Sequence, residues 1–318
     1  RVLFRSWADG VQPQDILALW HAFIMSFAPF DTQGAYHNPP AMDSGNAWAM
    51  GPSRTVEHRA TLVINPHQHF NGPFQWYEAH LVLGDMNVYG AALRGLPVIV
   101  QGYNPVLGWA LTPNKPDYAD LYVEQLTGPA ATGENRPKAI GGNEALQQQM
   151  DNLLLLEYMA QAQPYYVRTA SGMEQRFTPA YIGPRGPLFE NKGGGLFSWR
   201  IGGYGQFGGL RQLMEMGRAQ GLGAFQEALA LQQLPCFHVV YADKEGNIFY
   251  LYNTDTGTRM PLPTSQAPPK EGDTPPPPQI TRWNQPLQAD LDLTAWSTHI
   301  PVSALPAVTN PPAGYIQA

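Results

Sequence analysis

The chain has little cysteine and little charge for its 318 residues. Cys236 is the single cysteine, and charged residues make up 14% of the sequence. One cysteine cannot form a disulfide within the chain or supply the thiolate set of a structural zinc site. Because Cys236 lies between Pro235 and Phe237 in a strand-like segment, we expect a buried, inert thiol. A nucleophilic cysteine is the alternative, and it requires an electropositive setting that this stretch lacks.

Clusters of basic residues and long apolar runs are also missing. The net charge is −6, from 19 basic and 25 acidic residues, with no run of Lys and Arg. This excludes the basic surface that nucleic-acid binding uses, so no nucleic-acid partner is expected. No segment reaches the roughly 18 consecutive apolar residues that a membrane-spanning helix requires. We therefore expect no insertion into a membrane.

Turn-forming and aromatic residues are abundant instead. The chain contains 32 glycines and 31 prolines, and 11% of it is aromatic. Short apolar runs between residues 46 and 126, separated by turn signals, predict an antiparallel meander or one layer of a sandwich. Other parts of the chain show helical periodicity, and the turn residues at 243–247 predict a hairpin. The expected class is α+β, with sheets covered by helices. The predicted helices are Pro13–Phe27, Leu210–Met216 and Ala224–Gln232.

The stretch from Ser44 to His67 predicts a strand, a polar turn and a second strand. Asn46–Met50 and Ala60–Ile64 are short apolar runs, and the Gly-Pro-Ser sequence at 51–53 separates them. Two adjacent strands of this length bring the start of the first close to the end of the second. We therefore expect Ser44 and His67 to approach each other.

Possible metal ligands occur in two places. His67 and His69 alternate in an extended segment, but no third ligand has a recognisable spacing, so a role in positioning or hydrogen bonding is favoured for them. Asp117 and Asp120 lie beside Pro116 and could bind calcium through their carboxylate oxygens. A solvated turn is the alternative for this pair. No cofactor is expected.

Ser44 is a candidate nucleophile only if a base lies beside it. In one class of hydrolases that base is the serine's own α-amino group, which cleavage of the chain releases. An unreactive serine in a loop is the alternative.

Several motifs in succession resemble the penicillin/cephalosporin/acyl-homoserine-lactone acylase family. The likeness runs over residues 13–318 in the family's order, and its motifs are specific as a set. The segments that carry it are Ser44–Arg54, Asn65–His67, Trp76–Leu81, Gly108–Trp109, Phe237–Asp243 and Asn310–Pro312. The resemblance implies the αββα sandwich of the N-terminal-nucleophile (Ntn) hydrolases. It also implies self-cleavage of a precursor and hydrolysis of a small linear acyl amide through an acyl-enzyme.

Residues 1–6 look like a translated sequencing adapter and are left out of the fold prediction. For the rest of the chain, the resemblance implies that residues 7–43 are the end of the small subunit with a linker, and that residues 44–318 are the first part of the large subunit. The chain is thus expected to be a fragment that forms only part of the sandwich. Its expected partners are the remainder of its own small and large subunits. A periplasmic or secreted location is implied by the family alone.

The family's catalytic pattern is altered in this sequence. The family pattern is close to Ser-Asn-x-Trp. Aligning Asn46 and Trp48 with this pattern places Gly45 in the slot of the nucleophilic serine, and Ser44 then lies one residue before that slot. Pro113 occupies the place of an oxyanion-binding N–H, which proline lacks, and His238 replaces an asparagine donor. Two hypotheses follow. The first is an amidohydrolase with Ser44 as nucleophile, His67 as a positioning group and His238 as oxyanion donor. The second is a non-catalytic family member that keeps an acyl-binding pocket.

Overall fold

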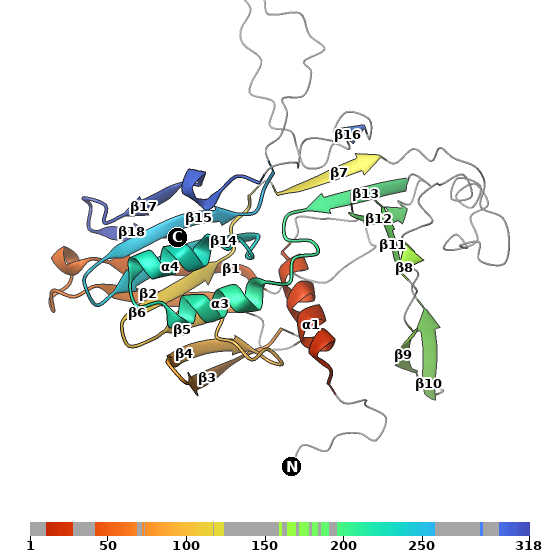
Figure 1. The fold of residues 1–318 in the computed structure, drawn as a ribbon, viewed down its shortest axis with the longest axis horizontal. Coiled ribbons are helices and arrows are strands. Elements are labelled where there is room, and N and C mark those ends of the chain that lie inside the picture. The colour runs from red at the N-terminus through yellow and green to blue at the C-terminus, as the bar shows by residue number, and fades with distance from the viewer. Residues whose placement is uncertain are drawn as a thin grey trace, which may run out of the picture.

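The computed structural model describes most of the two central sheets and the helices beside them (Figure 1). The described residues are 11–27, 42–68, 72, 74–116, 118–123, 159–160, 164–169, 172–177, 180–183, 186–190, 196–257, 287–288 and 299–318. Among them, no helix is long and apolar enough to cross a lipid bilayer.

A seven-stranded antiparallel sheet, here called the long sheet, is the centre of the molecule. Its strand order is β17-β15-β14-β6-β5-β4-β3. The strands β3 to β6 follow each other as a meander, and β14 and β15 form a hairpin beside β6. The bounds are β3 Trp76–Leu83, β4 Met86–Leu93, β5 Gln101–Tyr103, β6 Leu107–Thr112, β14 Cys236–Asp243, β15 Ile248–Thr254 and β17 Ala307–Thr309. The predicted hairpin is confirmed, and the predicted meander is confirmed for β3 to β6. The prediction of a single layer over residues 46–126 is wrong, because the strands at 42–50, 61–68 and 119–123 belong to two other sheets.

A three-stranded antiparallel sheet, the short sheet, packs on one face of the long sheet in the order β18-β1-β2. It consists of β1 (Met42–Met50), β2 (Thr61–Gln68) and β18 (Tyr315–Gln317), and the one-turn helix η1 (Pro52–Arg54) follows β1. Small side chains fill the space between the sheets, among them Ala47, Ala49 and Ala110. Because alternate residues of a strand point to opposite faces, the intervening residues of β1 and β2 face away from the long sheet.

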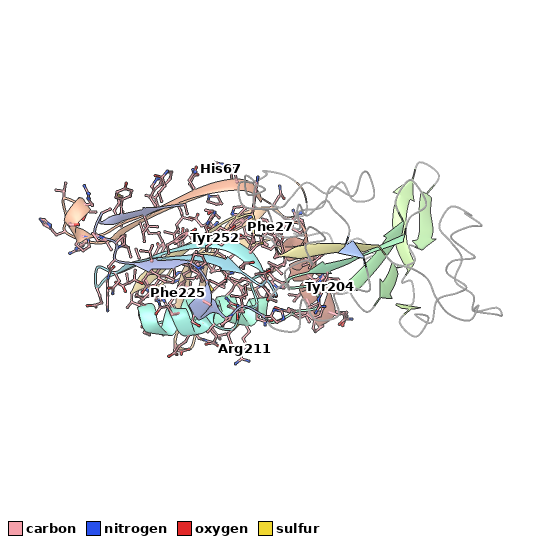
Figure 2. The ribbon with its side chains drawn as sticks, turned by 90° about the horizontal axis from the view of Figure 1, so that it is seen from above. Phe27, His67, Tyr204, Arg211, Phe225 and Tyr252 are labelled. Carbon is pink, nitrogen blue, oxygen red and sulfur yellow. The ribbon has the colours of Figure 1, made fainter. Side chains whose placement is uncertain are left out.

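Two helices cover the opposite face of the long sheet, α3 (Gly209–Arg218) and α4 (Leu222–Leu229). Trp109, Phe225 and Tyr241 are completely buried between the helices and the strands. Burial of each such side chain stabilises the fold by about 1.5–3 kcal/mol. Figure 2 shows the resulting layers, with Phe225 and Arg211 on the helical side and His67 on the side of the short sheet.

Helix α1 (Pro13–Met25) lies at one end of these layers. Pro13 occupies its first turn, and the backbone N–H of Gln12 donates to the Asp15 carboxylate, which caps the helix. Its Trp20 lies directly over Gly209, where a Cβ atom would come within 2.2 Å of the indole ring. Glycine at the start of α3 therefore permits the contact between the two helices.

The remaining described strands form a six-stranded sheet and a separate hairpin. The sheet has the order β16-β7-β13-β12-β11-β8. Its strands are β7 Ala119–Val123, β8 Met159–Ala160, β11 Ala180–Gly183, β12 Gly186–Glu190, β13 Leu196–Ile201 and β16 Leu287–Gln288, and the hairpin consists of β9 Pro164–Thr169 and β10 Gly172–Phe177.

The C-terminal segment is rich in proline, yet its described part contains η5 (Val302–Ala304) and the strands β17 and β18. β17 extends the long sheet next to β15, and β18 pairs with β1. The prolines lie between these short elements, where their missing N–H groups cost no ladder hydrogen bond. The predicted linker before residue 42 lies outside the described residues.

Candidate active site

Ser44 and His67 are brought together by the hairpin of β1 and β2, as the sequence predicts. The two residues lie opposite each other in the ladder, and Asn46 lies opposite Asn65. The Oγ of Ser44 is 2.6 Å from Nδ1 of His67. On the other side of the ring, Nε2 lies 3.3 Å from Nδ2 of Asn65. The imidazole is thus held between a hydroxyl and an amide.

Ser44 and Gly45 lie on opposite faces of the short sheet. Ser44 and His67 are exposed, and so is Asn65, two residues before His67. At Gly45, a Cβ atom would lie 3.1 Å from Cγ2 of Thr112 on β6. The serine slot of the family pattern therefore faces the long sheet, whereas the Ser44 hydroxyl faces outward. A shift of the strand by one residue would be required to exchange them.

His238 shares the inner face with the Gly45 slot. It lies opposite Thr112 in the pairing of β14 with β6, and paired residues project from the same side of a sheet. Nδ1 of His238 is 2.8 Å from the Tyr250 hydroxyl, and the ring of Tyr252 meets it edge-on. Burial lowers the pKa of His238, so the imidazole is neutral near pH 7. If the Tyr250 O–H donates to Nδ1, the ring proton lies on Nε2, as an oxyanion donor requires.

Buried polar atoms without partners lie at this end of the long sheet, on both of its faces. Thr112 is on the inner face, whereas Asn253, opposite Phe237, is on the helical face. Thr112 Oγ1, Asn114 Oδ1 and Asn253 Oδ1 have no hydrogen-bond partner within the described part of the chain. The amide ends of both asparagines are occupied, because Asn114 donates to the Asn253 carbonyl and Asn253 donates to the Leu234 carbonyl. Orphaned buried acceptors are rare in proteins and indicate a place where water or a ligand group can bind. Pro113, next to Thr112, is half-buried and brings no N–H to this region.

Nothing in the described part of the chain tests the predicted calcium site. Asp117 and His69 lie outside the described residues, and Asp120 lies in β7 without a described side chain. Within the described residues, no three His, Cys, Asp or Glu side chains form a group that could hold a metal ion. Calcium at Asp117 and Asp120 stays a prediction.

Cys236 is buried in β14, and burial raises its pKa to about 12. It therefore remains a thiol at physiological pH, as expected for an inert cysteine.

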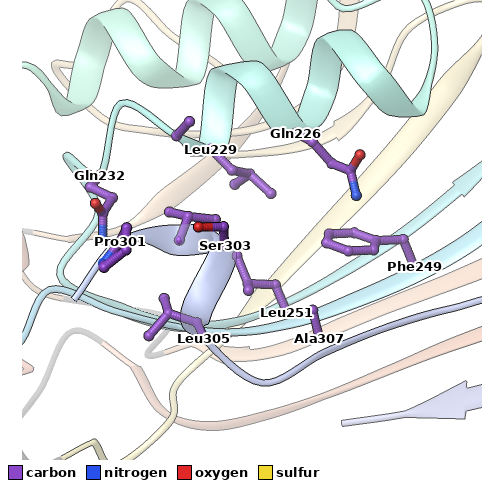
Figure 3. A pocket seen from close by; sticks show the side chains of 11 residues that line it. Gln226, Leu229, Gln232, Phe249, Leu251, Pro301, Ser303, Leu305 and Ala307 are labelled. Atoms are coloured by element: carbon purple, nitrogen blue, oxygen red, sulfur yellow. The ribbon is translucent and has the colours of Figure 1, made fainter.

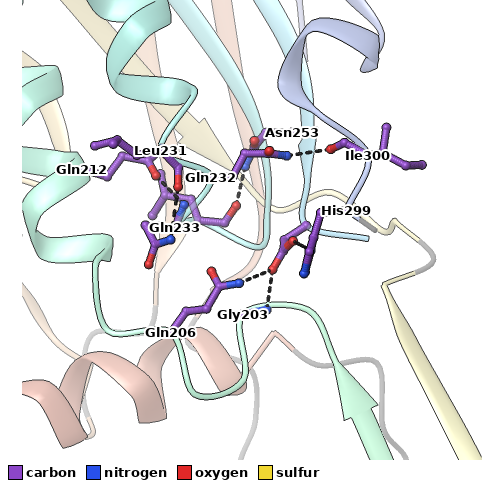
Figure 4. Close-up of polar contacts among 11 residues, drawn as sticks. Gly203, Gln206, Gln212, Leu231, Gln232, Gln233, Asn253, His299 and Ile300 are labelled. Atoms are coloured by element: carbon purple, nitrogen blue, oxygen red, sulfur yellow. Dashed lines mark hydrogen bonds and ion pairs between the residues drawn. The ribbon is translucent and has the colours of Figure 1, made fainter. Parts of the chain in front are cut away.

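A second hydrogen bond of a histidine, between His299 and Asp255, lies at the end of the long sheet (Figure 4). Nδ1 of His299 is 2.5 Å from Oδ1 of Asp255, and the other oxygen of Asp255 accepts hydrogen bonds from the Gly203 N–H and the Gln206 amide, both at 2.8 Å. The carboxylate thus joins the end of the long sheet, the loop after β13 and the segment before η5. We call this group the Asp255 clamp.

A cavity of about 490 Å³ opens between α4 and the C-terminal segment (Figure 3). Its lining residues include Leu229, Phe249, Leu251, Ser303 and Leu305. Phe249 and Leu251 belong to the face of β15 that packs against the helices. The cavity is therefore on the other side of the long sheet from Gly45 and His238, and it is not part of the candidate site.

Three residues of the site were not singled out as functional in the sequence: Asn65, Thr112 and Tyr250. Asn65 could have been found from the alternation of β2, which places it on the same face as His67. Thr112 and Tyr250 become visible only through the pairing of β6, β14 and β15, and the sequence does not give that register.

Comparisons with known proteins agree with the fold and the motifs. The family model described as Penicillin amidase matches residues 4–318. The acyl-homoserine lactone acylase PvdQ of Pseudomonas syringae pv. tomato is 28% identical over 66% of this chain and 27% of its own length. PvdQ of Pseudomonas fluorescens Pf-5 is 41% identical over 88 residues, which cover 27% of this chain and 11% of that protein.

A solved structure supports the same architecture. A thermostable penicillin G acylase from Alcaligenes faecalis superposes with a TM-score of 0.57 at 20% identity, covering 86% of this chain and 43% of its own. The expected Ntn-hydrolase fold is thereby confirmed. The chain spans less than half of that structure and about a quarter or less of the PvdQ relatives. From the family match over nearly its whole length, we conclude that the chain belongs to the penicillin amidase family.

Proposed function

We propose that this chain is part of an acylase-type amidohydrolase that cleaves a linear acyl amide through an acyl-enzyme at Ser44. The observation that carries the proposal is the 2.6 Å contact between Ser44 Oγ and His67 Nδ1. A serine becomes a nucleophile when a group beside it takes its proton, and this contact keeps the hydroxyl in a defined position. Cleavage between Asp43 and Ser44 would release an α-amine as the base, with His67 positioning the hydroxyl.

The substrate class follows from the relatives. The proteins that the chain is similar to are named acyl-homoserine lactone acylases and a penicillin G acylase. Both names denote removal of an acyl group from an amide, so a small acyl amide is the proposed substrate here. The remainder of both subunits would complete the pocket, and a periplasmic or secreted location is proposed from the family.

The oxyanion-binding part of the mechanism is weakened in this chain. His238 could donate from Nε2, since Tyr250 lies against Nδ1. Pro113 supplies no N–H, and removal of one such donor costs about 10²–10³ in rate. We therefore propose slow turnover compared with relatives that carry both donors.

Two measurements on the full-length protein that contains this chain test this function. Intact-mass analysis detects cleavage before Ser44, and an amine-reactive fluorophore detects amine released from N-acyl-homoserine lactones and from penicillin G. We expect a cleaved chain and released amine, both abolished by Ser44→Ala and retained in Ser53→Ala, an exposed serine on η1. A chain that stays whole and releases no amine contradicts the proposal.

One observation favours a non-catalytic binding protein as the second candidate. The family's nucleophile slot holds Gly45, where a serine Cβ would lie 3.1 Å from the methyl group of Thr112, closer than an ordinary contact. The unpartnered hydroxyl of Thr112 nearby could bind a polar group of an acyl ligand that is not cleaved. Gly45→Ser tests this hypothesis together with Thr112→Ser, which removes the crowding methyl group. If the double variant cleaves itself and releases amine while the natural chain does neither, the slot has lost its nucleophile.

A further inference from the structure

The exposed face of the short sheet carries a serine, a histidine and an asparagine in contact. Ser44 begins the regular pairing of β1, and His67 and Asn65 lie on β2. The contacts, 2.6 Å from Ser44 Oγ to His67 Nδ1 and 3.3 Å from His67 Nε2 to Asn65 Nδ2, run in one line through the imidazole. A nucleophile, a base and a third group that orients the base form the usual arrangement of covalent catalysis by serine.

The chain is continuous through Ser44 in this arrangement. β1 begins at Met42, so the nitrogen of Ser44 is a peptide nitrogen. A peptide nitrogen has no basic lone pair and cannot accept the hydroxyl proton. Among the described groups with a hydrogen bond to Oγ, His67 Nδ1 is a base. Rotation of the Asn65 amide by half a turn places its oxygen toward Nε2–H, which leaves Nδ1 free to accept.

We propose that Ser44 and His67 act as a nucleophile–base pair in the uncut chain and accept activated acyl donors, of the ester class, from the exposed face. The inference rests on Ser44 being the nucleophile of the proposed function, but it removes the need for self-cleavage. Oγ attacks the carbonyl carbon while its proton passes to Nδ1, and the C=O electrons move to the oxygen. When the carbonyl re-forms, the bond to the leaving alkoxide breaks, and the alkoxide takes the proton from His67.

Hydrolysis of the acyl-serine follows the same balance. Water attacks the ester carbon and gives one proton to His67, and that proton returns to Oγ as the acid leaves. The net reaction adds one water to one ester. Activated esters are the expected class because a good leaving group lowers the demand for oxyanion donors, and no such donor has been assigned beside Ser44.

An alkyl fluorophosphonate is the suitable probe, since it reacts with serine nucleophiles and leaves a stable adduct. Oγ forms the bond to phosphorus, fluoride leaves, and the proton goes to His67. The 318-residue chain is labelled, and mass spectrometry of its peptides locates the adduct. We expect the adduct on Ser44 in the uncut chain. We expect His67→Ala to slow labelling by about 10²-fold or more, as loss of a general base does.

Matched controls separate chemistry from folding. His80 is exposed on β3 and its Nε2 lies 2.7 Å from an oxygen of Asn87, but it has no serine partner, so His80→Ala should label at the parent rate. Added imidazole should restore part of the labelling in His67→Ala, which a purely structural role of His67 would not allow. A thermal melt of each variant, with His67→Gln included as a conservative replacement, shows whether the short sheet is intact.

Three outcomes overturn the inference: no adduct on Ser44, unchanged labelling in His67→Ala, or an adduct only on chains that begin at Ser44. The third outcome leaves the proposed amidohydrolase standing, with the α-amine as its base. Conversely, labelling of the uncut chain without amine release from acyl amides supports the pair and contradicts the proposed amide substrate. The two proposals therefore fail separately.

Discussion

Two histidines in this protein make short hydrogen bonds through Nδ1, in very different surroundings. His67 meets the hydroxyl of Ser44 at 2.6 Å on the exposed face of the short sheet. His299 meets the carboxylate of Asp255 at 2.5 Å, where the Asp255 side chain is 2% exposed and the His299 side chain 49%. The bond lengths are nearly equal, but the cost of breaking each bond is not.

Burial decides that cost. Water can replace either partner of the exposed pair, so the pair contributes little to the free energy of unfolding. Asp255 is shielded from water and satisfies two further donors, the Gly203 N–H and the Gln206 amide. Loss of the buried acceptor leaves these donors unsatisfied. The exposed pair is therefore free to transfer protons, while the clamp holds the loop after β13 to the long sheet.

Asp255→Ala should give the largest effect on stability. Removing the acceptor of three hydrogen bonds in a buried place should lower the free energy of unfolding by about 3 kcal/mol. Urea denaturation followed by tryptophan fluorescence measures this. Asp85→Ala is the matched control, because Asp85 is 84% exposed and lies 3.6 Å from Arg218, so the change should stay within about 0.5 kcal/mol. Equal losses in the two variants would contradict the role of burial.

His299→Ala should have a smaller effect on the same clamp. It removes one donor, while Asp255 keeps the Gly203 and Gln206 donors, so a loss of about 1–2 kcal/mol is expected. Urea denaturation again measures it, with His80→Ala as an exposed control that should change little. If His299→Ala destabilises as much as Asp255→Ala, the clamp depends on the histidine rather than on the buried carboxylate.

The hairpin at the candidate site could be predicted from the sequence because its signals are local. Apolar runs of strand length and the Gly-Pro-Ser turn at 51–53 fix β1 and β2, and their lengths bring Ser44 to His67. Helix α1 and the hairpin of β14 and β15 were likewise predicted from periodicity and turn residues. Local signals are enough wherever the partners are neighbours in the chain.

The face that each residue occupies could not be predicted in this way. A strand exposes alternate residues, and only the packing of the short sheet on β6 shows that Gly45 faces Thr112 while Ser44 faces outward. The strand β17 was not predicted, because a three-residue strand has no periodicity of its own. The partners of β17 and β18, which are β15 and β1, lie far away in the sequence.

The histidine on the inner face should make stability depend on pH. Burial lowers the pKa of His238, so the unfolded chain, with a pKa near the ordinary value of about 6.5, binds this proton more readily than the folded chain does. Stability should therefore fall as the pH drops below about 6.5, and His238→Gln should flatten this part of the curve. Burial also lowers the pKa of His21, which acts in the same direction, so some slope should remain. Urea midpoints between about pH 5 and 8 measure the change, and an unaltered slope in His238→Gln would contradict it.

His67→Ala should have the smallest effect on stability and a large one on reactivity. Both partners of the Ser44–His67 pair are exposed, so the free energy of unfolding should change by no more than about 0.5 kcal/mol. The same variant should lose about 10²-fold or more in labelling by the fluorophosphonate. A thermal melt and a labelling time course on one preparation measure both quantities. Had the pair been structural, stability and labelling would fall together. A stable chain with an unreactive Ser44 assigns the exposed histidine to chemistry. A marked loss of stability in His67→Ala would instead show that the Ser44–His67 pair stabilises the fold, as the Asp255 clamp does.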